Sequence, residues 1–153
     1  MYEFLSRIMP VKNVILDLSV TSKKRAFEQA GLFFENHHGL ARSVVFDSLI
    51  SRERLGSTAL GEHVAIPHGR IKNLNYALAI FIRFKNSINF DSADKKPVKL
   101  VLALLIPEKA TAYHLDILAT FAQILSSKIL RKALIIEKEQ FIVHRMLTTG
   151  KLV

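Results

Sequence analysis

The sequence has 153 residues, of which 50% are hydrophobic and 23% charged, so it predicts one compact domain over residues 1–153 and excludes a disordered chain. It contains no cysteine, which excludes disulfides, thiolate nucleophiles and cysteine-ligated metals. The formal net charge of +9 favours an acidic protein partner over nucleic acid, because the sequence has no zinc-finger or helix-turn-helix spacing and no aromatic residues interleaved with the basic ones.

Membrane insertion and secretion are not expected. No apolar run approaches the ~20 residues of a membrane-spanning helix. The first residues, MYEFLSRIMPVKNVILDL, lack the cationic region, apolar region and cleavage site of a signal peptide. We therefore expect a cytoplasmic protein.

Two helices are predicted before residue 56. The first covers KKRAFEQAGLFFEN, after Thr21-Ser22, and ends at His38-Gly39. The second runs from about Ala41 to Leu55, with Gly56 in its C-terminal turn. Apolar residues at helical spacing are expected to face inward: Ala26, Phe27, Ala30, Phe33 and Phe34 in the first helix, and Val44, Val45, Leu49 and Ile50 in the second.

Three apolar runs predict strands, at residues 64–68, 76–84 and 98–107, and the last is apolar enough to be covered on both faces. Between the first two runs, Pro67 restricts the backbone and Gly69 permits a positive φ. Together they predict that His68 lies at the end of a strand, on a defined and exposed turn.

Two further helices are predicted after the last strand, one capped by Thr111 and one in EKEQFIVHRML. Helices flanking a central sheet predict an α/β sandwich, although this pattern does not fix the strand order. The expected buried residues are Leu115, Leu118, Phe121, Ala122 and Leu125 in the first of these helices, and Phe141, Ile142 and Met146 in the second.

A group of basic residues suggests phosphoryl chemistry. Neutral imidazole is nucleophilic, so an accessible His68 could accept a phosphoryl group. His114 falls in the first helical turn after Thr111, where free N–H groups favour an anion, although a half-buried helix-start histidine is an equal interpretation. Arg52 and Arg54 end the second helix and could bind phosphate through paired hydrogen bonds, although a lone arginine at a helix end usually complements the helix dipole. No Walker A loop is present, so ATP is not expected to be the donor.

The other histidines have simpler interpretations. His37 and His38 are expected to complement the dipole at a helix end, and His144 to be a partly exposed structural residue. His63 and His68 would leave opposite faces of an extended segment, so they are not expected to share a metal.

Two segments, SRERLGSTALGEHVAIPHGR and SADKKPVKLVLALLIPEKATAYHLDILATFAQIL, resemble the enzyme IIA domain of the bacterial phosphoenolpyruvate-dependent phosphotransferase system, mannitol/fructose type. The resemblance extends over about residues 11–147 and is strongest to the nitrogen-regulatory branch. It implies a mixed β-sheet flanked by helices on both faces, in three layers, and no metal or organic cofactor.

The resemblance also implies roles for three residues. His68 would be the phosphoacceptor, modified on Nε2 by a phosphohistidine of an HPr-type carrier. His114 would steady the phosphoryl group, and Arg52 would contact it. One position departs from the family, which commonly has glycine or another small residue where this sequence has His63.

Three functions follow as hypotheses. The first is a regulatory phosphocarrier, whose phosphorylation state is read by partners such as potassium-transport regulators or sensor kinases. The second is a sugar-specific IIA component, which would pass phosphate to a cysteine on a separate IIB protein. The third is an adaptor that binds partners without being phosphorylated.

Overall fold

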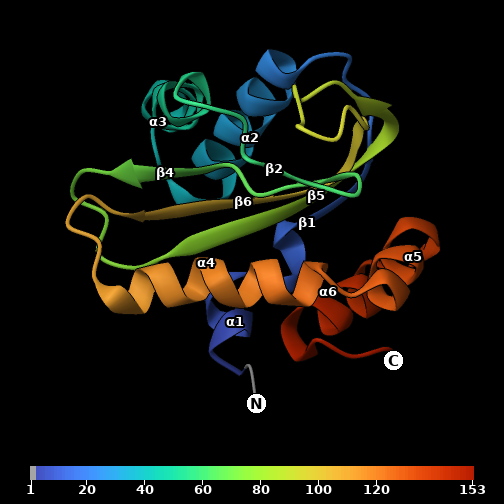
Figure 1. Ribbon diagram of the computed structural model, residues 1–153. Helices are drawn as coiled ribbons and strands as arrows, with labels where there is room; N and C mark the ends of the chain where they lie inside the picture. Colours follow the sequence, from blue (N-terminus) through green and yellow to red (C-terminus); the bar gives the residue numbers. More distant parts are fainter. Residues whose placement is uncertain (1–2) are drawn as a thin grey trace.

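The structure is a computed structural model that describes residues 3–153 as a β-sheet between two layers of helices (Figure 1). The strands in this part of the chain are β1 (Val14–Leu18), β2 (Ala59–Gly61), β3 (Val64–Ala65), β4 (His68–Ile71), β5 (Leu78–Ile88) and β6 (Val98–Pro107). The helices are α1 (Glu3–Ile8), α2 (Lys23–His38), α3 (Arg42–Arg54), α4 (Ala112–Leu125), α5 (Lys128–Ile136) and α6 (Gln140–Thr149), with a 3-10 turn at Val11–Asn13.

The sheet is mixed and centred on β6. Its strand order is β1-β5-β6-β3-β2, and β4 also pairs with β6. β5 runs antiparallel to β6, whereas β3 and β4 run parallel to it. Val64 pairs with Leu100 and His68 with Leu104, so β3 and β4 keep one register along β6. The interruption falls at Pro67, which has no N–H to donate, so the predicted strand at residues 64–68 is present in two parts.

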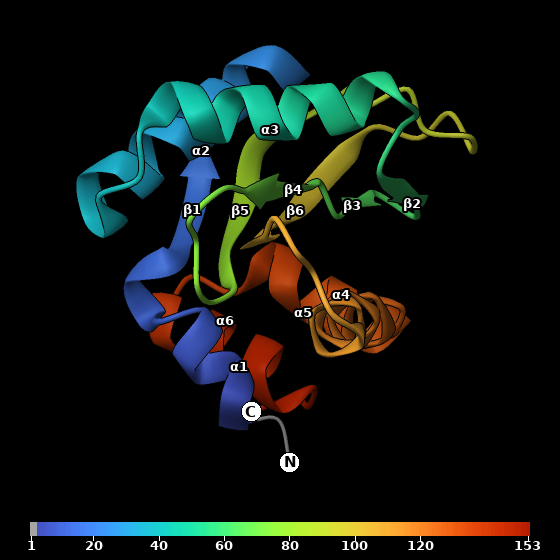
Figure 2. The same ribbon diagram turned by 90° about the vertical axis from the view of Figure 1, so that its left-hand side faces the viewer.

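The sheet buries both of its faces. α2 and α3 cover one face, and α1, α4, α5 and α6 cover the other (Figures 1 and 2). Along β5 the side chains alternate, with Ala79 and Phe81 facing α4 and Ile80 and Ile82 facing α2 and α3. β6 is buried along most of its length, which confirms that residues 98–107 form a strand covered on both faces.

Some predicted inward faces are wrong. Val44, Leu115 and Phe141 are 47%, 53% and 58% exposed. α4 and α6 are turned so that other residues reach the core, namely Ile117 and Ile124 in α4 and Val143 and Leu147 in α6. The sequence patterns also missed α1, β1, α5 and the short strand β2. The inward residues that the structure confirms as buried are Ala26, Phe27, Ala30, Phe34, Val45, Leu49, Phe121, Leu125 and Met146.

No helix within residues 3–153 combines the length and the hydropathy that crossing a membrane requires.

Candidate active site

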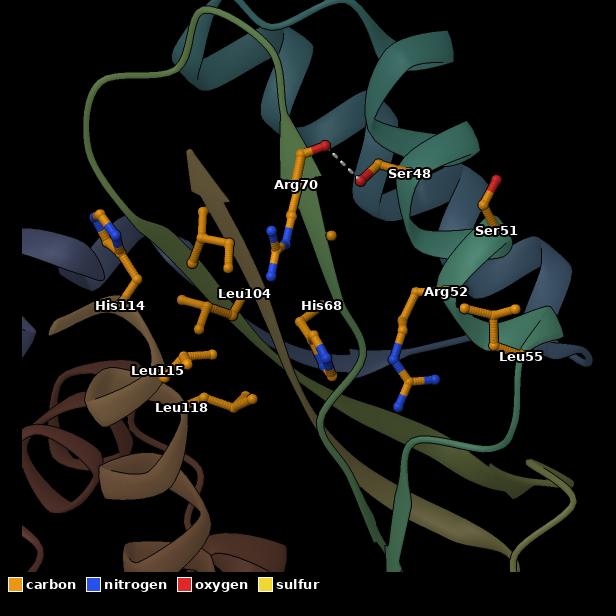
Figure 3. Close-up of a pocket in the computed structure, with 12 residues that line it drawn as sticks. Ser48, Ser51, Arg52, Leu55, His68, Arg70, Leu104, His114, Leu115 and Leu118 are labelled. Atoms are coloured by element: carbon orange, nitrogen blue, oxygen red, sulfur yellow. Dashed lines mark hydrogen bonds between the residues drawn. The ribbon is translucent and has the colours of Figure 1, made fainter. Parts of the chain in front are cut away.

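A cavity of about 330 Å³ lies at the end of the sheet, between α3 and the start of α4 (Figure 3). His68 lines it from β4, Arg52 from α3 and His114 from α4. These elements are far apart in the sequence, and the fold brings the three predicted site residues to one cavity.

β4 approaches α3 so closely that only glycine fits beside His68. A Cβ on Gly69 would lie 2.0 Å from Oγ and 2.9 Å from Cβ of Ser48. Ser48 in turn donates a hydrogen bond of 3.0 Å from Oγ to the carbonyl oxygen of Arg70 (Figure 3). The expectation of a turn with positive φ at Gly69 is therefore wrong: Gly69 lies in a strand and permits a close helix–strand contact. His68 is accordingly the first residue of a strand and half-buried, not a residue of an exposed turn.

One hydrogen bond fixes the protonation pattern of His68. Its Nδ1 lies 3.0 Å from the carbonyl oxygen of Ile66, which can only accept, so Nδ1 carries a proton. In the neutral ring, Nε2 then holds a free lone pair. Within residues 3–153, every side-chain nitrogen or oxygen that is fully buried has a hydrogen-bond partner. Nε2 of His68 has no partner among these residues, so it is not fully buried and reaches the surface. The ring presents a nucleophilic nitrogen to the outside.

Arg52 is held by its own helix end. Its Nη1 donates 2.9 Å to the carbonyl oxygen of Gly56, and its guanidinium lies beside the His68 ring in Figure 3. A guanidinium has five N–H donors, so most of those on Arg52 remain available to an anion.

A buried carboxylate anchors the loop that follows Arg52. The side chain of Glu53 is 3% exposed, and its carboxylate accepts from both N–H and Oγ of Thr58. Lys23 Nζ lies 3.0 Å from the same carboxylate, which leaves the buried charge paired. Through this contact α2, α3 and residues 56–58 are joined just behind Arg52.

The side chain of His114 caps the start of α4. The backbone N–H of Thr111 donates to Nδ1 of His114 over 3.1 Å, so Nδ1 is an acceptor and the neutral ring carries its proton on Nε2. In Figure 3 the ring is directed away from His68, with Leu104 and Leu115 between them. His114 therefore lines the cavity as a neutral donor without touching His68.

Some cavity residues were not predicted as site residues. Arg70, Ser48, Ser51 and Leu55 line the cavity, and Leu115 was expected to be in the core. A signal for Arg70 was present in the sequence, because residues two apart on a strand share a face and Arg70 follows His68 by two. Ser48 and Leu55 carry no such signal.

His38 and His144 have structural roles. Nε2 of His38 lies 3.0 Å from Oδ1 of Asn13, and burial lowers the pKa of His38, with Lys12 and His37 adding positive charge. His38 lies in the last turn of α2, as expected, and its burial disfavours the charged form that would complement the helix dipole. His144 is 8% exposed and donates from Nε2 to the carbonyl oxygen of Met9, so it is buried and not partly exposed.

His63 occupies the turn between β2 and β3. Glu62 and His63 both have left-handed φ, of 53° and 69°, which costs non-glycine residues roughly 1–2 kcal/mol each. Nδ1 of His63 donates to the carbonyl oxygen of Pro97 over 2.8 Å. His63 does not line the cavity that holds His68. Within residues 3–153, no three His, Asp or Glu side chains are grouped as a metal site would require.

The sequence and the structure match known proteins over most of the chain. The family model described as phosphoenolpyruvate-dependent sugar phosphotransferase system, EIIA 2, matches residues 7–148. A nitrogen regulatory protein of Bradyrhizobium diazoefficiens is 38% identical over 130 residues, 85% of each chain. One from Escherichia coli K12 is 38% identical over 108 residues, 70% of this chain and 66% of its own.

Solved structures agree with this match. The nitrogen regulatory protein IIA-Ntr of Neisseria meningitidis has a TM-score of 0.90 and 42% identity, covering 95% of this chain and 99% of its own. IIA mannitol from Escherichia coli, at 20% identity, shares the fold with a TM-score of 0.76 over 89% of this chain and 96% of its own. This chain belongs to the EIIA 2 family of the phosphoenolpyruvate-dependent sugar phosphotransferase system.

Proposed function

We propose that this chain is a regulatory phosphocarrier that accepts a phosphoryl group on Nε2 of His68 from a phosphohistidine of an HPr-type carrier. The observation that supports this most directly is the hydrogen bond from Nδ1 of His68 to the carbonyl oxygen of Ile66. It leaves Nε2 as the nitrogen with a lone pair, at the surface of a cavity that also holds Arg52.

The transfer needs no proton to move on this chain. The Nε2 lone pair forms a bond to phosphorus, the bond from phosphorus to the carrier nitrogen breaks, and its electron pair returns to the carrier imidazole. The proton on Nδ1 stays there throughout, hydrogen-bonded to the Ile66 carbonyl oxygen. Phosphoryl transfer depends mainly on positioning and charge stabilisation, and β4 supplies the first of these through its tight packing on α3.

Charge stabilisation comes from Arg52 and His114 in this proposal. Arg52 carries a permanent charge and has free N–H donors beside the His68 ring. His114 holds its proton on Nε2 and would donate a hydrogen bond from it to a phosphoryl oxygen once the ring turns toward His68. Its role is therefore tied to a small reorientation that accompanies phosphorylation or docking.

The regulatory role rests on the relatives. Those named nitrogen regulatory protein reach 38% identity, whereas a fructose-specific EIIA component of Haloferax volcanii is 28% identical over 86% of this chain. The chain has no cysteine, so a sugar-specific relay would need a cysteine on a separate IIB protein. In the proposed role, potassium-transport regulators or sensor kinases of the cytoplasm read the added phosphoryl charge.

Labelling from phosphoenolpyruvate tests this function. With enzyme I and an HPr-type carrier, the chain is expected to take up acid-labile phosphate, and mass mapping should place it on His68. His68→Ala and His68→Gln are expected to abolish the label. His37→Gln is a matched control, because His37 is exposed and outside the cavity. Label that persists in both His68 variants would refute the assignment.

A second assay separates regulation from sugar transport. The phosphorylated chain is mixed with IIB proteins of the mannitol and fructose type, and loss of label from His68 is followed. The regulatory role predicts no transfer faster than spontaneous hydrolysis. Rapid transfer to a IIB cysteine would favour the sugar-specific function.

A further inference from the structure

Arg70 lies on the same face of β4 as His68. Successive side chains of a strand point to opposite faces, so His68 and Arg70 face the α4 side while Gly69 faces α3. The register agrees, because His68 pairs with Leu104 and Arg70 with Ile106, and both partners belong to the core on the α4 side. Arg70 lines the same cavity as His68.

The backbone of Arg70 is fixed while its side chain is nearly free. Its carbonyl oxygen accepts the hydrogen bond from Ser48 Oγ, and its pairing with Ile106 fixes β4 against β6. The guanidinium makes one long contact, 3.4 Å from Nη1 to the carbonyl oxygen of Glu108, and it forms no ion pair within residues 3–153. A rigid base therefore presents a cation whose hydrogen-bond donors are almost all unused.

Figure 3 shows where this cation points. The Arg70 side chain extends from β4 into the cavity, on the side of His68 that faces His114, whereas Arg52 approaches His68 from α3. Glu53, the residue after Arg52, does not line the cavity, and its carboxylate is paired with Lys23. Arg52 from α3 and Arg70 from β4 thus line the cavity around His68. Neither takes part in the ion pairs found within residues 3–153.

We propose that Arg70 is a further catalytic residue, which donates N–H bonds to the phosphoryl oxygens from the side opposite Arg52. The inference rests on the proposed function of His68. Arg70 keeps its protons and its charge while the phosphorus–nitrogen bond forms on His68 and breaks on the carrier. Its contribution is greatest where the transferring group carries charge over its three equatorial oxygens.

Single-turnover phosphotransfer from the phosphorylated HPr-type carrier tests this role. Arg70→Gln is expected to lower the maximal rate about ten- to a hundredfold, as loss of a charge-assisted hydrogen bond implies, with the carrier concentration at half-maximal rate nearly unchanged. Arg70→Lys should recover part of the rate, because it restores the charge without the planar fork. Thermal melts would establish that both variants are folded.

Arg54→Gln is the matched control. Although the sequence offered Arg54 beside Arg52 as a phosphate ligand, Arg54 is exposed on α3 and does not line the cavity. Its loss changes the net charge by the same amount as the loss of Arg70. The proposal is overturned if Arg70→Gln behaves like Arg54→Gln. It is also overturned if Arg70→Gln raises only the half-saturating carrier concentration, because Arg70 would then contact the carrier and not the phosphoryl group.

The His68→Ala variant separates this proposal from the proposed function. If His68→Ala takes up no label and Arg70→Gln transfers at the unmodified rate, the phosphocarrier function stands and the role of Arg70 fails. If His68→Ala is still labelled, the proposed function itself fails.

Discussion

Arginines in two regions of the molecule differ in how many of their hydrogen-bond donors the fold uses. Arg83, in the middle of the sheet, is 3% exposed. It donates to both carboxylate oxygens of Asp17, over 3.0 and 3.1 Å, and to the carbonyl oxygens of Leu134 and Glu137. Its guanidinium therefore ties β5 to the end of β1 and to the end of α5.

The cavity arginines are held much more loosely. Arg52 makes one hydrogen bond, to the Gly56 carbonyl, and Arg70 makes one long contact, to the Glu108 carbonyl. A guanidinium with four of its five donors used, like that of Arg83, stabilises the fold, whereas one with mostly spare donors at a cavity can bind an anion. Hydrogen-bond capacity, more than residue type, distinguishes the two regions.

Replacing Arg83 should produce the largest loss of stability. Arg83→Met keeps the apolar length of the side chain but leaves two carbonyls and Asp17 without their donor. We expect the free energy of unfolding to fall by about 3 kcal/mol, measured by urea denaturation. Molecules that remain folded should still accept phosphate at close to the normal rate.

Arg52→Gln should show the opposite pattern, a small change in stability and a large loss of phosphotransfer. Its free energy of unfolding should change by less than about 1 kcal/mol, while phosphotransfer should slow at least about tenfold. Equal losses of stability in the Arg83 and Arg52 variants would show that the two arginines do not differ in the way the hydrogen bonds suggest.

Gly69→Ala should have the next largest effect. The new Cβ would meet Ser48 at 2.0–2.9 Å, so β4 or α3 must shift, at a cost of about 2 kcal/mol in the free energy of unfolding. Because β4 carries His68, phosphotransfer should fall as well.

A double-mutant cycle with Ser48→Gly tests the cause of that loss. Ser48→Gly removes both crowded side-chain atoms and itself costs about 1 kcal/mol in the helix. The double variant should lose clearly less stability than the sum of the single changes, by about 1 kcal/mol. Strict additivity would show that Gly69 is needed for another reason.

Gly69 also illustrates what the sequence could predict. The sequence indicated that the position after His68 needs a glycine. It could not show whether the reason is a positive φ or a close contact with another element, because Ser48 lies twenty-one residues away on α3. The long apolar run at residues 98–107 predicted β6 correctly, since burial on both faces leaves a simple pattern.

The site was partly predictable for a similar reason. Motif spacing and family resemblance named His68, His114 and Arg52, and the structure brings all three to one cavity. The orientation of α4 was not predictable, because Leu115 fits an apolar stripe equally well whether it faces the core or the cavity. Only the packing of α4 against β6 decides this, by burying Ile117 and Phe121.

The smallest expected effect concerns the titration of Asp17. Its hydrogen bonds from Arg83 lower its pKa below the usual 3.8; burial opposes this, and the charges of Arg83, Lys99 and Lys85 add to it. A carboxyl group whose pKa is lowered by folding stabilises the protein fully above about pH 3.8, and that contribution is lost as the pH falls below this value. Arg83→Met should therefore return the Asp17 midpoint toward 3.8, as measured by carboxyl-carbon NMR.

Asp94 is an internal reference for that measurement. The Ser92 hydroxyl and the backbone N–H groups of Glu62 and Lys96 lower the pKa of Asp94 to about 2, without any arginine. Its midpoint should therefore stay near 2 in Arg83→Met while that of Asp17 rises. If both midpoints moved together, the substitution would be acting through a general change of the fold and not through the one guanidinium that joins β5 to Asp17.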